Sequence, residues 1–357
     1  MSTHERSPGV IGLLRDPLRT LRKARRRKLD CRQFLNCPEM LEPELRASEI
    51  KRLIFYNHYH NGDIHFSREI VAGILKLLPS VPCVYSHACP PDLLADLPAL
   101  THDAALLKGL PRNSPYVVDK LSKTVFINTW IGCLGQDLVQ ECRGINITLL
   151  HNIIRASLAR ATGLCAPELA QCAPNPDFTR FYVMNIDAFV RSDTRTRVLI
   201  SNGKVLSAQS ADFDFTPLIE SLASKHRDIL FIPTNPTPLR QANIIHSADI
   251  IRKNGPDLNE NGYLSTFCSA IIGKSSGTYS FSINRVNLQS PKVFLSFVNH
   301  PVEASLGFDE PVFNSHCTFI ATNDFRPVAV RRNMARAVQL ATDPKFQTAR
   351  VAFGTAD

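Results

Sequence analysis

The sequence predicts an α/β protein made of two domains, each built around a parallel β-sheet. A chain of 357 residues is too long for one ordinary core and fits two domains of roughly 150 residues each. Apolar runs of strand length alternate along the chain with helical apolar patterns, and this alternation is typical of βαβ units. The composition, with 44% apolar and 20% charged residues, is that of an ordinary globular protein.

The first half of the chain supplies a strand, helix, strand series. Short apolar runs predict strands, and apolar residues that recur every three or four positions predict helices. The expected strands lie at 52–57, 81–87 and 124–128, and the expected helices at 67–78 and 145–163. The following stretch, 165–196, is rich in Pro, Asp and Asn, which indicates a domain boundary near residue 195.

The second half repeats the alternation without repeating the sequence. Strand-length apolar runs lie at 197–202, 228–235, 243–251, 269–275, 292–299 and 316–322, and helical patterns lie at 215–226, 258–268 and 325–342. We therefore predict four regions. They are a basic N-terminal arm (1–49), a first α/β domain (50–195), a second α/β domain (196–323), and a C-terminal helix with its tail (324–357).

The excess of positive charge belongs to the N-terminal arm. The formal net charge is +9, but residues 1–34 hold ten Arg or Lys against three acids, a local net of +7, which leaves +2 for residues 35–357. Leucines interleave the basic residues between positions 10 and 32, a mixture that suits either an anionic membrane surface or a solvated arm. A nucleic-acid partner is not expected, because the basicity does not continue into the globular part.

The cysteine pattern and the hydropathy of the chain indicate the cellular compartment of the protein. Ten cysteines occur without a Cys-x-x-Cys pair, which suits buried thiols in a reducing compartment better than a zinc knuckle. No run of about 18 apolar residues is present, and the stretch VIGLL is too short for a secretory signal. The expectation is a cytoplasmic protein, with attachment to the inner membrane face through the arm as a further option.

The first candidate site follows the first expected strand, in the sequence NHYHNGDIHFSR (57–68). Ligands of parallel sheets bind outside the carboxyl ends of the strands, and this turn occupies such an end. Gly62 permits a tight turn or the close approach of a ligand. Asp63 could serve as a general base for a nearby hydroxyl, or it could simply cap the next helix.

A metal site is the competing interpretation of the same residues. His58, His60, Asp63 and His65 are similar to the His-x-His-x-Asp-His signature of metallo-β-lactamase-like hydrolases, but with one residue inserted before the aspartate and one before the last histidine. Zinc ligands must converge at about 2.0–2.2 Å, and these insertions would redirect the side chains. Those hydrolases are also antiparallel sandwiches, so the metal interpretation is not favoured.

The second candidate site is the turn after the strand at 270–272. It runs through Gly273, Lys274, Ser275, Ser276, Gly277 and Thr278 into an expected helix. Small residues and hydroxyls at such a turn suit a phosphate or diphosphate, and Lys274 could add a point charge. Capping of the helix is the simpler alternative. Glu260, in LNENGY, could bond a ribose hydroxyl or could face solvent.

In these two stretches the chain resembles the glycosyltransferases of the GT-B architecture, and in particular the heptosyltransferase-like enzymes of glycosyltransferase family 9. Gly62, Asp63 and His65 look like the Gly-Asp turn and following histidine of that group, and NENGYLSTFCSAIIGKSSGTYSF looks like its donor-binding segment. The resemblance implies two Rossmann-like domains that face each other across a cleft. The usual donor turn of the family is replaced here by Ser275-Ser276-Gly277.

The resemblance also implies roles. Asp63 would be the general base, with His65 beside it at the catalytic site. The donor side would comprise Gly62, Lys274, Ser275, Ser276, Gly277, Thr278 and Glu260, with a nucleotide-sugar as substrate, a glycan or glycolipid as acceptor, and no metal or other cofactor. The resulting prediction is a glycosyltransferase. The alternatives are a non-catalytic protein that binds a glycan or nucleotide, and a metal-dependent hydrolase that uses the three histidines and Asp63.

Overall fold

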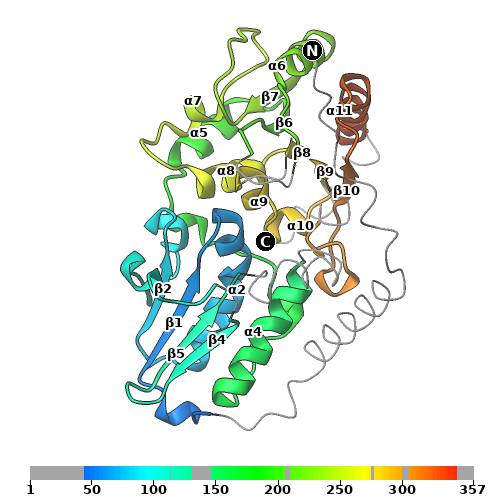
Figure 1. Cartoon of the computed structure of the whole chain (residues 1–357). Coiled ribbons are helices and arrows are strands. Elements are labelled where there is room, and N and C mark those ends of the chain that lie inside the picture. The colour runs from blue at the N-terminus through cyan, green and yellow to red at the C-terminus, as the bar shows by residue number, and fades with distance from the viewer. Residues whose placement is uncertain are drawn as a thin grey trace, which may run out of the picture.

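The computed structural model describes residues 44–112, 114–130, 146–205, 210–274, 277–299 and 305–343. Within them, two five-stranded sheets follow one another in the chain and occupy opposite ends of the molecule (Figure 1). The predicted α/β fold with two Rossmann-like sheet regions is therefore confirmed. The basic stretch at 10–32, and with it the proposed membrane contact, lies outside the described residues. No helix among the described residues is long and apolar enough to cross a membrane.

The first sheet is parallel except at one edge. Its strands are β1 (Arg52–Asn57), β2 (Cys83–His87), β3 (Leu100–His102), β4 (Tyr116–Asp119) and β5 (Thr124–Asn128), in the order β3-β2-β1-β5-β4. Only β4 is antiparallel, to β5. β3 and β4 escaped the sequence prediction because they are short and none of their side chains is fully buried, so neither forms a continuous apolar run.

Helices α2 (Asn61–Leu77) and α4 (Ile147–Thr162) pack against each other beside this sheet. In α2 the residues Ile70, Val71 and Ile74 recur at helical spacing and are all fully buried. α4 begins at Asn146, whose side chain accepts a hydrogen bond from the Leu149 N–H at 2.7 Å, and it ends at Gly163 in the left-handed region (φ 73°).

The second sheet is wholly parallel. Its strands are β6 (Thr196–Ser201), β7 (Ile229–Pro233), β8 (Ala270–Lys274), β9 (Val293–Phe297) and β10 (Thr318–Thr322), in the order β10-β9-β8-β6-β7. Alternate residues face opposite sides, as strand geometry requires. Val198 and Ile200 contact the apolar cluster beneath α6 (Thr216–Lys225) and α11 (Pro327–Thr342), whereas Leu199 belongs to the cluster on the other side.

The remaining helices lie mostly between and around the two sheets. They are α5 (Met184–Ser192), α7 (Ser247–Ile251), α8 (Leu258–Ser265), α9 (Gly277–Ser282) and α10 (Arg285–Leu288), with 3-10 turns at Ala47–Glu49, Pro91–Leu94, Ala104–Leu107, Leu169–Gln171, Phe178–Arg180 and Pro311–Phe313. The apolar run at 243–251 is not a strand: it makes one bridge at Ile244 and then forms α7.

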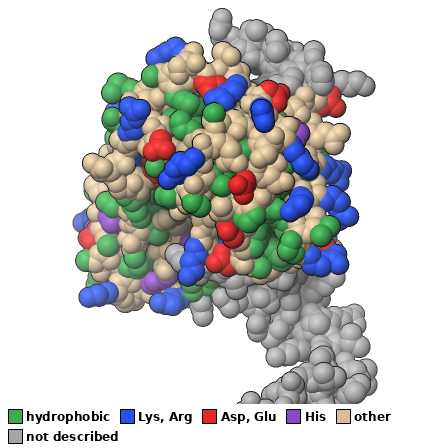
Figure 2. Space-filling view, turned by 90° about the horizontal axis from the view of Figure 1, so that it is seen from above, with side chains coloured by type: hydrophobic (Ala, Val, Ile, Leu, Met, Phe, Trp, Pro, Cys, Tyr) green, Lys and Arg blue, Asp and Glu red, His purple; other side chains and the backbone are tan. Residues whose placement is uncertain are grey.

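One continuous apolar cluster joins the two halves of the molecule. It includes Phe55 of β1, Ile64 of α2, Ile271 of β8 and Phe281 of α9, all at most 1% exposed. Side chains from both sheets therefore share a core at the interface. On the face seen in Figure 2, basic and acidic side chains are interspersed, in keeping with the low net charge outside the arm.

A buried arginine adds a polar clamp to this interface. Arg68 of α2 is fully buried and forms an ion pair with Asp96. Its guanidinium also donates to the Leu93 carbonyl at 2.6 Å and, across the interface, to Asn259 Oδ1 of α8 at 3.0 Å. Because a buried guanidinium needs its partners in place, these bonds fix α2 relative to α8.

We expect Arg68→Met to destabilise the protein by about 3–5 kcal/mol, because it leaves the Asp96 carboxylate buried without its cation. Urea unfolding monitored by circular dichroism measures the effect. The matched control is Arg326→Met, which breaks an ion pair with Asp324 in which the arginine is 82% exposed, and which should hardly change the midpoint. Equal shifts for the two variants would show that the clamp does not hold the interface.

Candidate functional site

Two asparagines shape the carboxyl edge of the first sheet. Asn57 ends β1 and Asn128 ends the neighbouring β5, and each side-chain Oδ1 accepts the N–H of the residue two positions later, at 2.9 Å for Tyr59 and 3.0 Å for Trp130. Asparagine commonly forms such local turns, in which its side chain accepts a backbone N–H two residues later. They bring the Tyr59 and Trp130 rings into a stack with centroids 3.7 Å apart, directly before the start of α2.

Asp63 lies in the first turn of α2, three residues after the N-cap His60. The two residues form a capping box, in which the Asp63 carboxylate accepts the His60 N–H at 3.3 Å. Burial raises the pKa of Asp63 to about 6, against an ordinary value of 3.8. Asp63 is therefore a helix cap, and it is also a carboxylate whose proton affinity suits a general base near neutral pH. Its catalytic role stays a prediction.

His65 lies two residues further along α2, and its side chain contacts the second domain. Its side chain is fully buried, its ring stacks on Phe281 with centroids 4.3 Å apart, and its Nε2 is 3.0 Å from the Ile283 carbonyl. Burial lowers the pKa of His65 to about 3, so the ring is neutral at physiological pH and Nε2 carries the proton donated to that carbonyl. In this position His65 packs and hydrogen-bonds across the interface.

The three histidines of the metal interpretation do not converge. His58 Nε2 lies 3.0 Å from the Leu110 carbonyl, His60 caps α2, and His65 bonds to Ile283 in the other domain. Among the described residues, no group of three or more His, Cys, Asp or Glu side chains is placed to hold a metal ion. The geometry of the histidines gives the metal-hydrolase alternative no support.

The second candidate turn begins at Lys274, the last residue of β8. Its Nζ lies 2.5 Å from Asp212 Oδ1, and 5.1 Å and 5.6 Å from the ring centroids of Phe213 and Phe215. Gly277 and Thr278 open α9, whereas Ser275 and Ser276 lie outside the described residues. The expected contacts of this turn with a diphosphate stay predictions.

The starts of α2 and α9, more than 200 residues apart in the chain, meet in space. Helices α2 and α9 pack together, and a Cβ built on Gly62 would lie 3.1 Å from Ser280 Oγ. A Cβ on Gly277 would lie 3.9 Å from Asn61 Nδ2. The start of α2, with Asp63, therefore adjoins the start of α9.

Glu260, in the first turn of α8, is buried and does not face solvent. It is 1% exposed, and its carboxylate pairs with Lys253 Nζ at 2.8 Å and accepts the Tyr182 N–H at 3.4 Å. Lys253 also pairs with Asp92 of the first domain at 3.2 Å. The solvent-facing alternative is therefore wrong, because Glu260 belongs to an ion cluster that bridges the domains. The ribose contact stays a prediction.

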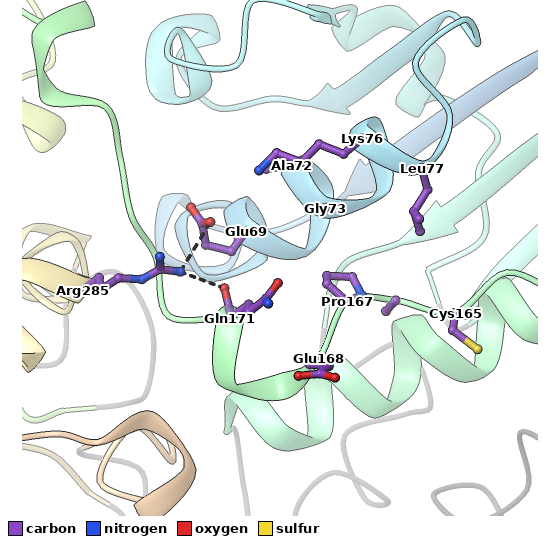
Figure 3. A pocket seen from close by; sticks show the side chains of 11 residues that line it. Glu69, Ala72, Gly73, Lys76, Leu77, Cys165, Pro167, Glu168, Gln171 and Arg285 are labelled. Atoms are coloured by element: carbon purple, nitrogen blue, oxygen red, sulfur yellow. Dashed lines mark hydrogen bonds and ion pairs between the residues drawn. The ribbon is translucent and has the colours of Figure 1, made fainter.

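A pocket of about 570 Å³ opens beside the second half of α2 (Figure 3). It is lined by Glu69, Ala72, Gly73, Lys76, Leu77, Cys165, Ala166, Pro167, Glu168, Gln171 and Arg285. In Figure 3, Arg285 reaches toward Glu69, at 3.8 Å, and donates to the Gln171 carbonyl at 3.0 Å. Gly73 is ten residues beyond Asp63, about 15 Å along the helix, so this pocket is separate from the two turns.

Gly73 allows the segment at 165–171 to approach α2, since a Cβ there would lie 2.5 Å from Pro167 Cγ. In an open helix, Gly→Ala stabilises by up to about 1 kcal/mol. Here we expect Gly73→Ala to destabilise by about 1–3 kcal/mol, measured by urea unfolding, because the added methyl overpacks the contact. The double variant with Pro167→Ala should recover most of the loss, and a Gly73→Ala protein more stable than wild type would contradict the contact.

Comparisons with known proteins find similar solved structures at low sequence identity. The sequence matches no family model, and no curated protein matches it. Similar solved structures include a glycosyl transferase of family 9 from Veillonella parvula, the ADP-heptose LPS heptosyltransferase II of E. coli, and the spinosyn forosaminyltransferase SpnP. Their identities are 9%, 12% and 15%, and their TM-scores 0.47, 0.45 and 0.41. The matches cover 84%, 81% and 85% of this chain and 98%, 98% and 94% of the others.

These solved structures are glycosyltransferases, and the likeness to them extends over most of this chain. At such identities and TM-scores they assign no role to any residue of this chain.

Proposed function

We propose that the protein is a glycosyltransferase that moves a sugar from a nucleotide-sugar donor to a hydroxyl of a glycan or glycolipid acceptor. The observation that carries the proposal is the contact between the starts of α2 and α9. A carboxylate with a pKa of about 6 stands at the start of α2, and the start of α9, which follows the small-residue turn in the chain, lies against this end of α2. Transfer from a diphosphate donor needs these two elements side by side.

The reaction assigns one step to each turn. Gly62, Lys274, Ser275, Ser276, Gly277 and Thr278 would hold the donor, so that its anomeric carbon faces the start of α2. The acceptor oxygen attacks that carbon, the bond from the carbon to the phosphate oxygen breaks, and the Asp63 carboxylate takes the acceptor proton. The nucleoside diphosphate leaves with the electron pair, and Lys274 would offset its charge.

The acceptor is expected at the carboxyl edge of the first sheet. Tyr59 is half-buried there, with one face on Trp130, and the Arg112 guanidinium lies 6.0 Å from its ring centroid. Aromatic rings and a guanidinium are common contacts for sugars and their polar groups. The stack is next to the N-cap of α2, so an acceptor bound on it would have a hydroxyl near Asp63.

The first experiment is a thermal-shift screen with ADP, UDP, GDP, dTDP and CMP, followed by assays of nucleoside diphosphate release from the matching sugars with glycan acceptors. Stabilisation by one nucleoside diphosphate together with acceptor-dependent release supports transfer. Stabilisation without release from any sugar would favour the non-catalytic binding protein. No stabilisation by any nucleotide would contradict transfer from a nucleotide-sugar and would leave glycan binding as the form of the non-catalytic alternative.

We expect Asp63→Asn to lower kcat by a factor of about 10²–10⁴, because general-base catalysis is lost, while the Kd of the nucleoside diphosphate changes little. Asparagine can still cap α2, so the fold should persist. The control is Asp103→Asn, since Asp103 caps a 3-10 turn by accepting the Ala105 N–H at 2.9 Å and has no place in the reaction. Turnover by Asp63→Asn equal to that of the control would remove Asp63 from the mechanism.

The pH dependence follows from the raised pKa of Asp63. Only the ionised carboxylate can accept a proton, and ionisation is lost as pH falls through about 6. We therefore expect kcat/KM to be level above pH 7 and to fall about tenfold per pH unit below 6. Steady-state rates between pH 4.5 and 8 measure this. If kcat/KM falls only near pH 4, then Asp63 is solvated in the working enzyme or is not the base.

A further inference from the structure

Lys274 is a buried ammonium whose counter-ion is exposed. The lysine side chain is 2% exposed, whereas that of Asp212, which lies 2.5 Å from its Nζ, is 60% exposed. A buried ammonium is costly without a negative partner, so Asp212 provides the neutralisation that Lys274 needs. Because the partner lies at the surface, another anion that reaches this position could replace it.

The segment that carries Asp212 is anchored behind it. Phe215 is 1% exposed, and Phe213 packs on Phe215 and Phe297 with ring centroids 4.6 Å and 5.1 Å apart. The two rings also face the Lys274 ammonium. The aromatic anchor, and not the ion pair alone, fixes the backbone at this point. The Asp212 side chain can therefore leave Lys274 without loss of the packing beneath it.

Lys274 and Asp212 lie at the edge of the second sheet where a doubly wound sheet binds its ligands. From β6 the chain goes to β7 on one side, and it later returns to β8 on the other side of β6. Ligands bind at the carboxyl ends of the strands at such a switch point. Lys274 ends β8, and Asp212 follows β6. The same lysine leads into the turn to which we assign the donor diphosphate.

We propose that Asp212 occupies, at the Lys274 ammonium, the place that a phosphate oxygen of the donor takes, and so limits the affinity of the protein for nucleoside diphosphates. This inference rests on the proposed function. In the resting protein the carboxylate neutralises the buried ammonium. When the donor binds, its phosphate replaces the carboxylate, which moves into solvent near Lys204. The charge of Lys204 already acts on Asp212, since it adds to the lowering of the Asp212 pKa that the Lys274 hydrogen bond dominates.

The test compares Asp212→Asn with wild type by isothermal titration with ADP, UDP, GDP, dTDP and inorganic pyrophosphate. Asparagine keeps an oxygen that can accept the lysine hydrogen bond but removes the competing charge. We expect the Kd of the bound diphosphates to fall about fivefold at low salt, the effect of one partly exposed charge pair. The gain should shrink in 0.5 M NaCl, because salt screens the charge that Asp212 contributes.

Two further variants make the test specific. Asp214→Asn removes the same charge two residues on, from a carboxylate that accepts the Thr216 N–H at 2.8 Å, and should leave the Kd within about twofold of wild type. Lys274→Met should weaken binding, and adding Asp212→Asn to it should give no gain. Melting curves provide a second measurement, since pyrophosphate should raise the melting temperature of Asp212→Asn more than that of wild type.

The outcomes separate the two proposals. Tighter binding by Asp212→Asn but not by Asp214→Asn supports the exchange. Unchanged or weaker binding by Asp212→Asn, in a protein whose wild type binds a nucleoside diphosphate, overturns the exchange and leaves the proposed function standing. An equal gain in affinity for Asp212→Asn and Asp214→Asn overturns the exchange as well, because the gain would then come from the change in net charge alone. Absence of binding in every variant overturns both proposals.

Discussion

The structure depends on the burial of one guanidinium, that of Arg68. In the middle of α2 this group is out of water, so it must keep Asp96, the Leu93 carbonyl and Asn259 as partners. Asn259 belongs to α8, and α8 packs closely on α9. The position of α2 is therefore tied through α8 to α9, and with it the distance between the two turns of the candidate site. A shared apolar cluster reinforces the same relation, because residues of β1, α2, β8 and α9 bury one another.

This constraint bears on how substrates enter. Rotation of one domain away from the other would expose Arg68, break its hydrogen bond to Asn259, and separate Lys253 from Asp92. Such a motion loses an interdomain hydrogen bond and an interdomain ion pair as well as apolar contact, and these losses oppose opening. Changes of side-chain partner at the surface, of the kind proposed for Asp212, leave the buried clamp intact. They are the less costly way for an anionic ligand to reach the end of β8.

The sequence predicts the fold well where strands are fully buried, and the site only where its parts are local. β1, β8 and β9 read as continuous apolar runs because both faces of each are covered. The half-exposed β3 and β4 give no such run. The turn at Asp63 is visible because glycine, aspartate and the helical pattern are adjacent in the chain. The partners of the predicted residues are not visible, since Asp212 precedes Lys274 by 62 residues and Ile283 follows His65 by 218. No local pattern marks Arg68, which looks like an ordinary polar position of an amphipathic helix until α8 covers it.

The proton affinity of Asp63 follows from the same packing that positions it. The first turn of α2 meets α9 at Gly62, and this contact helps to exclude water from the turn. Loss of water disfavours the charged form of a carboxyl group, so its pKa rises to about 6 in spite of the His60 hydrogen bond, which acts in the opposite direction. At pH 7 such a group is still about nine-tenths ionised, and it binds a proton about a hundredfold more tightly than an ordinary aspartate. The first turn of α2 thus combines contact with α9 and a carboxylate of raised proton affinity, and the proposed catalytic role of Asp63 needs both.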